Sequence, residues 1–132
     1  MIDHLSTYTT DYPKTHAFYQ AAFDALGYSQ QAEFVAHWNE SFPTQRNCAY
    51  GPEGKPVFWI IETQTPATPR HIAFAASSRA AVDAFYHAGL AEGGHCNGKP
   101  GLRPIYHADY YGAFLIDPDG NNVEAVCHLP EG

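Results

Sequence analysis

The sequence predicts an α+β protein built from two βαβββ modules, each of which forms a cupped, mixed sheet. Three observations support this fold class. Strand-like and helix-like segments follow one another in the same order in both halves of the chain. A turn of the type Pro-acidic-Gly occurs twice, at Pro52 and at Pro118, with an offset of 66 residues. Each half has a single helix, whereas a parallel sheet needs a crossover connection between neighbouring strands.

The first half contains these signals in the order β, α, β, β, β. Alanine and large apolar side chains recur at spacings of three and four on one helix face, and Gly27 ends that helix as a C-terminal cap. The turn-like sequence from Gly51 to Gly54 precedes a strand that is almost entirely apolar. The predicted elements are strands over 2–9, 28–36, 48–50 and 57–62 and a helix over 14–26.

The second half repeats this order. Ser77 or Ser78 is a suitable N-cap for an alanine-rich helix. The stretch around Lys99, Pro100 and Gly101 is predicted to be a loop, because Gly, Pro and Asn favour turns. The predicted elements are strands over 70–76, 111–116 and 122–127, a helix over 79–91 and a turn over 117–120.

The composition indicates one globular domain over residues 1–132, with one module over about 1–66 and the other over about 67–132. Hydrophobic residues make up 45% of the chain, which is enough for a substantial core. The net charge is −7 and only seven residues are Lys or Arg. Nucleic acid is therefore not an expected partner, because a phosphate backbone needs a basic surface.

The chain lacks the sequence features of membrane or secreted proteins. No apolar run reaches the length of a membrane span, and the first residues do not have the pattern of a signal peptide. The three cysteines, Cys48, Cys96 and Cys127, are widely spaced and form no CxxC motif. This usage fits a reducing compartment, so we expect a cytoplasmic protein with no membrane partner.

Three sequence features together resemble a known superfamily. His4 lies in the first predicted strand, His71 opens the segment His-Ile-Ala-Phe, and residues 110–126 contain Asp-Pro-Asp-Gly-Asn-Asn-Val-Glu. This pattern resembles the vicinal oxygen chelate superfamily, which includes glyoxalase I, fosfomycin-resistance enzymes, extradiol dioxygenases and bleomycin-binding proteins. The resemblance covers nearly the whole chain, and residues 117–124 are its most specific part.

The resemblance implies a metal site, because members of the superfamily place ligands on the first and last strands of each module. The matching residues here are His4, His71 and Glu124. Two His and one carboxylate suit a divalent ion such as Zn, Mn, Fe, Ni or Co and leave positions open for substrate oxygens. By the 66-residue offset, the fourth ligand position falls on Phe58, which cannot coordinate a cation; Glu62 is the alternative on that strand.

A different interpretation of the same residues needs no metal. His4 and His71 would then be strand histidines satisfied by hydrogen bonds. Glu124 would be paired with Arg70 or Arg103.

The remaining candidate site residues are mostly aromatic. We expect Phe58 to face the cup and to give it an apolar wall, and Trp38 is a second candidate for a wall. Four residues precede or begin the strand over 111–116 and are candidates for substrate contact or proton transfer, with Tyr110 and His107 as catalytic candidates beside Glu124. These four are Tyr106, His107, Tyr110 and Tyr111. The alternative is that this aromatic group packs the loop or a dimer interface.

Two classes of function fit the sequence. The first is a metal-dependent enzyme acting on a small oxygenated substrate, as a lyase, isomerase, transferase or dioxygenase. The second is a metal-free, bleomycin-resistance-like protein that binds a small aromatic or cationic ligand, which the negative charge and the aromatic content permit. The three retained ligand residues favour the first class. The resemblance also implies a homodimer, in which His4 of one chain would join His71 and Glu124 of the other.

Overall fold

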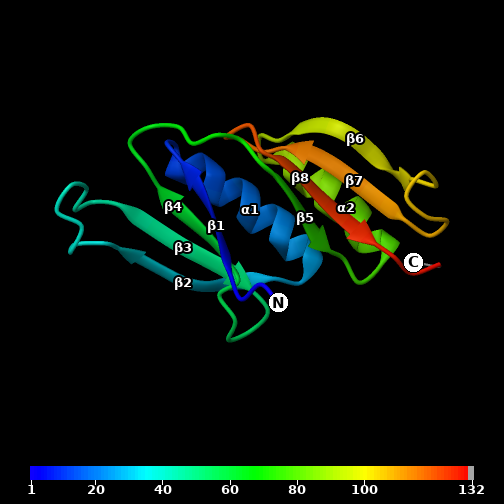
Figure 1. Cartoon of the computed structure of the whole chain (residues 1–132), viewed down its shortest axis with the longest axis horizontal. Coiled ribbons are helices and arrows are strands. Elements are labelled where there is room, and N and C mark those ends of the chain that lie inside the picture. Colours follow the sequence, from blue (N-terminus) through cyan, green and yellow to red (C-terminus); the bar gives the residue numbers. More distant parts are fainter. Residues whose placement is uncertain (131–132) are drawn as a thin grey trace.

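Two four-stranded mixed sheets, each with one helix, form the protein in this computed structural model, which describes residues 1–130 (Figure 1). The first sheet has the strand order β1-β4-β3-β2, with β1 parallel to β4 and the other pairs antiparallel. Its elements are β1 (Leu5–Thr9), α1 (Tyr12–Leu26), β2 (Ser29–Val35), β3 (Arg46–Gly51) and β4 (Phe58–Glu62).

The second sheet repeats the connectivity of the first, with the order β5-β8-β7-β6 and β5 parallel to β8. Its elements are β5 (His71–Ala75), α2 (Arg79–Ala91), β6 (His95–Leu102), β7 (Tyr111–Ile116) and β8 (Asn122–Cys127). The predicted α+β class with two βαβββ modules is confirmed. The last two residues of the predicted second module, 131 and 132, lie outside the described residues.

The structure confirms two of the predicted helix caps, Gly27 and Ser78. In contrast, Asp11 caps α1, which begins two residues before the predicted helix, and Glu92 is the C-cap of α2. The Asp11 side chain accepts a hydrogen bond from the Lys14 backbone at the start of α1. Gly27 ends this helix with a φ of 79°, in the left-handed region that glycine adopts without strain. In α2 the N-cap is Ser78, whose hydroxyl accepts from the Ala81 backbone at 3.0 Å.

β6 occupies the stretch expected to be a loop, and β1 begins at Leu5, so that His4 precedes the strand in which it was predicted. Gly98, Pro100 and Gly101 all lie within β6, and its pairing with β7 is interrupted by register shifts on both sides of Gly98. β6 is the outer strand of its sheet. Pro and Gly are tolerated in an edge strand with bulges, because part of its backbone needs no ladder partner.

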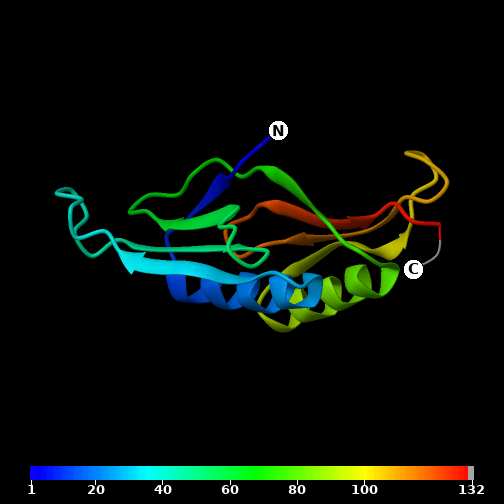
Figure 2. The same cartoon turned by 90° about the horizontal axis from the view of Figure 1, so that it is seen from below.

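The helices cover one face of the sheets, and no helix among residues 1–130 covers the other (Figure 2). We call the second face the open face. The core lies under the helices, and Phe23 of α1 contacts rings from both sheets in it. The Phe23 ring centroid lies 5.4 Å from that of Phe58 in the first sheet and 4.9 Å from that of Phe74 in the second. The two modules therefore share one hydrophobic core.

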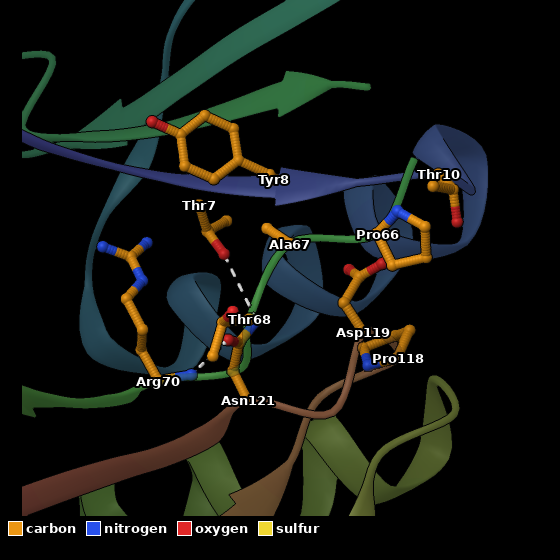
Figure 3. A pocket seen from close by; sticks show the side chains of 10 residues that line it. All are labelled: Thr7, Tyr8, Thr10, Pro66, Ala67, Thr68, Arg70, Pro118, Asp119 and Asn121. Atoms are coloured by element: carbon orange, nitrogen blue, oxygen red, sulfur yellow. Dashed lines mark hydrogen bonds between the residues drawn. The ribbon is translucent and has the colours of Figure 1, made fainter. Parts of the chain in front are cut away.

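Polar contacts from the turn at residues 117–120 also join the modules. Tyr19 of α1 donates to Asp117, and Thr15 donates to Asp119 at 2.6 Å. Burial and the Asp117 carboxylate raise the pKa of Tyr19 well above its ordinary value, so its hydroxyl remains a donor. A cavity of about 220 Å³ lies beside this junction, with Arg70 and Asp119 on opposite walls (Figure 3). Residues of the segment 117–124, the most specific part of the resemblance, thus form hydrogen bonds that join the two modules.

No helix within residues 1–130 is long and apolar enough to cross a membrane.

Candidate functional site

The strand register places Glu124 on the open face of the second sheet. Its neighbours along β8, Val123 and Ala125, belong to the hydrophobic core under α2. Side chains alternate along a strand, so Glu124 points the other way. Glu124 pairs with Ala73 on β5 and with Phe114 on β7, and these residues form one row across the open face. His71 lies two residues before Ala73 and faces the same side.

Both oxygens of the Glu124 carboxylate are in contact with neighbouring side chains. Oε1 lies 3.1 Å from Nε2 of His71, and Oε2 accepts a hydrogen bond from the Tyr110 hydroxyl. These two neighbours leave Glu124 only 2% exposed, although it points toward the uncovered face. A buried carboxylate is costly unless it is paired or coordinates a metal, so this position calls for a cation or a donor.

The contacts of the His71 ring define which nitrogen is free. Nδ1 lies 3.0 Å from the backbone carbonyl oxygen of Asn122, which can only accept a hydrogen bond. Nδ1 therefore carries a proton. If the ring is neutral, Nε2 directs a lone pair at the Glu124 carboxylate; if it is protonated, Nε2 donates to that carboxylate. Two lone pairs face each other at this contact unless the ring takes a second proton or a cation lies between them.

This pair fits a divalent metal ion in chemistry and in spacing. With metal bonds of about 2.1 Å, two ligands of one ion are separated by about 3.0 Å at right angles and by about 3.4 Å in a tetrahedral site. The observed separation of His71 Nε2 and Glu124 Oε1 is 3.1 Å. Nδ1 of His71 is already fixed by a carbonyl, as is usual for a metal-binding histidine. Imidazole nitrogen and carboxylate oxygen suit first-row divalent ions.

His4 does not reach this pair within the chain. It precedes β1, is exposed, and its Nδ1 lies 2.6 Å from the carboxylate of Asp3. It lines a shallow hollow on the first module together with Lys55 and Trp59. Among residues 1–130, no three His, Cys, Asp or Glu side chains are grouped so that they could hold one ion. Convergence of His4, His71 and Glu124 within one chain is therefore not observed, and convergence between chains stays a prediction.

The placement predicted for Phe58 is wrong. Phe58 is 3% exposed, and its ring packs against Tyr19 and Phe23 of α1, on the helix side of the sheet. The strand register gives the reason. Ser6 pairs with Trp59 just as Ala73 pairs with Glu124.

His4 and His71 lie two residues before Ser6 and Ala73, respectively, so the position equivalent to Glu124 is Trp59. The turn-based offset is one residue too long, and a one-residue shift in a strand moves a side chain to the other face. Indole is a donor and does not coordinate a metal, so the first module still lacks a carboxylate ligand here. Glu62 does not replace it, because Arg46 binds both of its carboxylate oxygens at 3.0 and 2.7 Å. The hydrogen bonds from Arg46 hold the pKa of Glu62 below its ordinary value.

The loop before β7 places several of the predicted residues beside Glu124. The Tyr110 ring lies 4.8 Å from that of Tyr106 and 5.6 Å from that of His107. Nδ1 of His107 accepts from the Asp109 backbone, so its Nε2 donates to Nδ1 of His128 at 2.8 Å.

His128 is a residue that the sequence interpretation missed. Its ring lies 5.3 Å from that of Tyr110. The alternation of side chains along a strand could have indicated it, because residue 128 lies on the same side as residues 124 and 126.

Tyr110 is held as a hydrogen-bond donor. Burial, and then its hydrogen bond to Glu124, raise the pKa of Tyr110 to about 12. Near neutral pH the hydroxyl is therefore protonated, and it can donate to Glu124 or to a substrate oxygen.

Tyr111, in contrast, lies on the helix side. Its hydroxyl donates to Asp83 of α2 at 2.6 Å, and the guanidinium of Arg79 lies over its ring. The prediction that Tyr111 faces the substrate side is wrong, because β7 alternates and only its even-numbered residues face outward.

Trp38 lies on the other module, in an aromatic cluster at the open face of the first sheet. Its ring stacks on Phe34 of β2 at 5.5 Å, and Phe34 contacts Trp59 of β4 at 6.0 Å. Trp38 is 72% exposed, so the predicted wall residue has no opposite wall in the described part of the chain. In the two views the loop over 36–45 and the loop over 103–110 lie at opposite ends of the molecule (Figures 1 and 2).

Neither arginine suggested as a partner of Glu124 forms an ion pair with it. Arg70 donates to the backbone carbonyl of Ser6 at the module junction. Arg103 donates to the carbonyls of Lys99 and Gly101. The arginine partner that the non-metal interpretation assumed for Glu124 is therefore not observed, and a protonated His71 is the cation that could pair with it within the chain.

Comparison with known proteins defines the class. The family model of the glyoxalase/bleomycin resistance protein/dioxygenase superfamily matches residues 1–125. The chain belongs to this superfamily, which confirms the resemblance seen in the sequence. No curated protein matches the chain.

Solved structures of the same superfamily have the same fold. A glyoxalase/bleomycin resistance protein from Albidiferax ferrireducens is 31% identical, with a TM-score of 0.74 over 96% of this chain and 98% of that chain. A mutant of glyoxalase I from Zea mays is 18% identical, with a TM-score of 0.70 over 95% of this chain and 46% of that chain.

A mutant of the fosfomycin resistance protein FosX from Listeria monocytogenes is 20% identical, with a TM-score of 0.67 over 96% of this chain and 90% of that chain. That structure contains Mn(II) and 1S,2S-dihydroxypropylphosphonic acid.

Proposed function

We propose that the protein is a divalent-metal-dependent enzyme acting on a small oxygenated substrate, by a lyase, isomerase, transferase or dioxygenase reaction. The observation that carries this proposal is the contact of His71 Nε2 with Glu124 Oε1 at 3.1 Å. In the neutral ring both atoms present lone pairs, and the carboxylate is buried without an arginine or lysine partner among the described residues. A divalent ion satisfies both atoms at once.

The proposed third ligand is His4 of a second chain, in a homodimer with two equivalent sites. Three features support this arrangement. The open face is not covered within one chain, His4 is exposed beside β1, and the candidate substrate residues Trp38 and Tyr106 belong to loops at opposite ends of the molecule (Figure 1). In such a homodimer a two-fold axis would bring His4 and the Trp38 loop of one chain onto the second sheet of the other chain.

The side chains around the pair have separate roles in this proposal. A bound metal ion supplies Lewis-acid polarisation of the substrate's oxygens. Glu124 and His71 hold the ion, and Tyr110 donates a hydrogen bond to Glu124 or to a substrate oxygen on which negative charge develops. His107, hydrogen-bonded to His128 and packed on the Tyr110 ring, is positioned to exchange a proton with the substrate. Tyr106 and Trp38 contribute apolar surface.

The metal content of the protein tests this proposal. We expect about one divalent ion per chain after purification without chelator and without a nickel affinity tag, measured by elemental analysis. Protein that is purified without metal and that takes up none of Zn, Mn, Ni, Co or Fe(II) in equilibrium dialysis would contradict the proposal.

The cytoplasmic location stays a prediction.

A second candidate function is a metal-free binding protein for a flat aromatic ligand. The exposed stack of Trp38 and Phe34, continued by Trp59, favours it, because aromatic faces bind rings and cations. This alternative gains support if the protein binds no metal but quenching of its tryptophan fluorescence reports an aromatic ligand.

The shared site predicts that metal binding and association are linked. Because each ion would contact both chains, adding metal should shift the monomer–dimer equilibrium toward dimer, and dilution should release metal. Sedimentation over a wide concentration range, with and without metal, measures both effects. The control is a His4→Ala variant, in which added metal should no longer promote association. A monomer that keeps its full metal content would exclude the shared site.

A further inference from the structure

We propose that Arg103 binds an anionic group of the substrate, so that the substrate carries a carboxylate, phosphate or phosphonate next to the oxygens that reach the metal. This inference rests on the proposed function and adds the substrate's charge to it. Arg103 follows β6 directly, and its backbone N–H donates to the Tyr110 carbonyl at 2.7 Å. It therefore stands at the base of the loop that supplies Tyr110 to Glu124.

The Arg103 guanidinium lies on the same face as the metal-binding pair. It sits over the Phe114 ring, with its central carbon 5.4 Å from the ring centroid. Phe114 pairs with Glu124 across the sheet, and its ring stacks with that of His71 at 6.3 Å. One phenyl ring thus contacts both the cation and the candidate metal ligand.

Backbone carbonyls fix the orientation of this guanidinium. One terminal nitrogen donates to the Gly101 carbonyl at 2.9 Å and the other to the Lys99 carbonyl at 2.6 Å. A guanidinium has five N–H donors, so three remain for a ligand. A guanidinium held in this way loses little further freedom when it binds an oxyanion through two parallel hydrogen bonds.

Arg103 also lacks an acidic partner, unlike two other arginines. Arg46 pairs with Glu62 and Arg79 approaches Asp109, whereas no described carboxylate lies within ion-pair distance of Arg103. Its residue is only partly exposed. A partly desolvated, permanently charged group beside a candidate catalytic pair is suited to a substrate anion.

Glycines make room for this side chain on the sheet. A Cβ at Gly98 would lie 3.2 Å from one terminal nitrogen of Arg103, and a Cβ at Gly101 would lie 3.2 Å from the other. At Gly112 a Cβ would lie 3.3 Å from the Tyr110 ring. Arg103 and Tyr110 therefore lie against backbone without side chains; at Gly98 the Phe114 ring, 3.0 Å from the added Cβ, favours glycine as well.

Binding of inorganic phosphate tests the inference. We compare the wild type with two variants. Arg103→Met keeps an unbranched apolar side chain over Phe114, and Arg103→Lys keeps the charge but loses the paired N–H donors of the guanidinium. Lys99→Met is the matched control, because it removes a neighbouring exposed charge from β6. The metal-loaded proteins are titrated with phosphate by calorimetry at constant ionic strength, and bound metal is counted in each.

We expect Arg103→Met to weaken phosphate binding by about 10- to 100-fold, the size of a lost charged hydrogen-bond pair. Arg103→Lys should lie between this variant and the wild type, and Lys99→Met should stay within about 2-fold of the wild type. Metal content should not change. Unchanged phosphate affinity in Arg103→Met with full metal content would overturn the inference and leave the metal site intact, as would a metal-loaded wild type that binds no phosphate.

Failure of the proposed function gives a different result. If the wild type binds no metal, the same titrations are made on the metal-free proteins. If phosphate binding to the metal-free proteins still depends on Arg103, this supports an anion site that needs no metal. If phosphate binding does not depend on Arg103, the anion site is overturned together with the metal site. If Arg103→Met does not fold, the decision rests on Arg103→Lys, for which an affinity equal to that of the wild type contradicts a role of the guanidinium fork.

Discussion

Glu124→Gln is expected to lower the affinity for a divalent ion by about 100-fold or more, because it removes the charged ligand while preserving the shape of the side chain. In the metal-free protein the same change should not destabilise the fold. When His71 is neutral, the new amide can donate to its Nε2, so that the two facing lone pairs at 3.1 Å are replaced by a hydrogen bond. Metal affinity is measured by competition with a chelating dye, and stability by thermal unfolding in EDTA.

The two readouts of this experiment separate a metal ligand from a structural residue. Excess metal should raise the midpoint of thermal unfolding of the wild type, by mass action, and leave that of Glu124→Gln almost unchanged. Tyr110→Phe is the control, since it removes the other contact of the carboxylate but no ligand. If Glu124→Gln is strongly destabilised in EDTA and binds metal normally, Glu124 is structural and the metal site is not where we place it.

Phe23→Ala is expected to lower the free energy of unfolding by about 3–5 kcal/mol, the usual cost of deleting a buried phenylalanine. The side chain is completely buried, and its ring contacts aromatic rings of both sheets, including Phe58 and Phe74. The loss should therefore weaken the contact between the modules as well as the first module itself. Urea unfolding followed by circular dichroism measures the change.

The matched control is Phe34→Ala, on the open face of the first sheet. Phe34 is partly exposed and contacts Trp38 and Trp59, so its removal should cost about 1 kcal/mol or less. If both variants lose the same stability, the aromatic core under the helices does not have the importance we assign to it. A marked loss in Phe34→Ala alone would instead indicate that the open face is covered in solution.

The predictable part of the site is the pair formed by His71 and Glu124. Both residues belong to strands with clear patterns, and the contact follows from the parallel pairing of β5 with β8. The partner of a parallel strand is not encoded locally, however, so the resemblance to the superfamily was needed to bring the two residues together. Tyr110 could be predicted only as a nearby residue, because its contact with Glu124 depends on how the preceding loop folds back.

Register and edge strands were the parts that sequence patterns did not resolve. The offset between the two turns made Phe58 the first-module counterpart of Glu124, whereas the pairing of β1 with β4 gives that position to Trp59. β6 was predicted to be a loop because it contains Gly98, Pro100 and Gly101, residues that an irregular edge strand accepts. Whether His4 reaches a metal depends on a second chain, and a pattern within one chain does not define that.

The strand order also determines when the candidate site can exist during folding. In each module the first strand pairs with the last one, β1 with β4 and β5 with β8, while the intervening strands pair with their sequence neighbours. Contacts between distant segments close long loops and form late, whereas hairpins form early. His71 and Glu124 come from β5 and β8, so they meet only when the last pairing of their module is made. Metal binding would therefore not nucleate the second module; it would trap the module after closure and slow its unfolding.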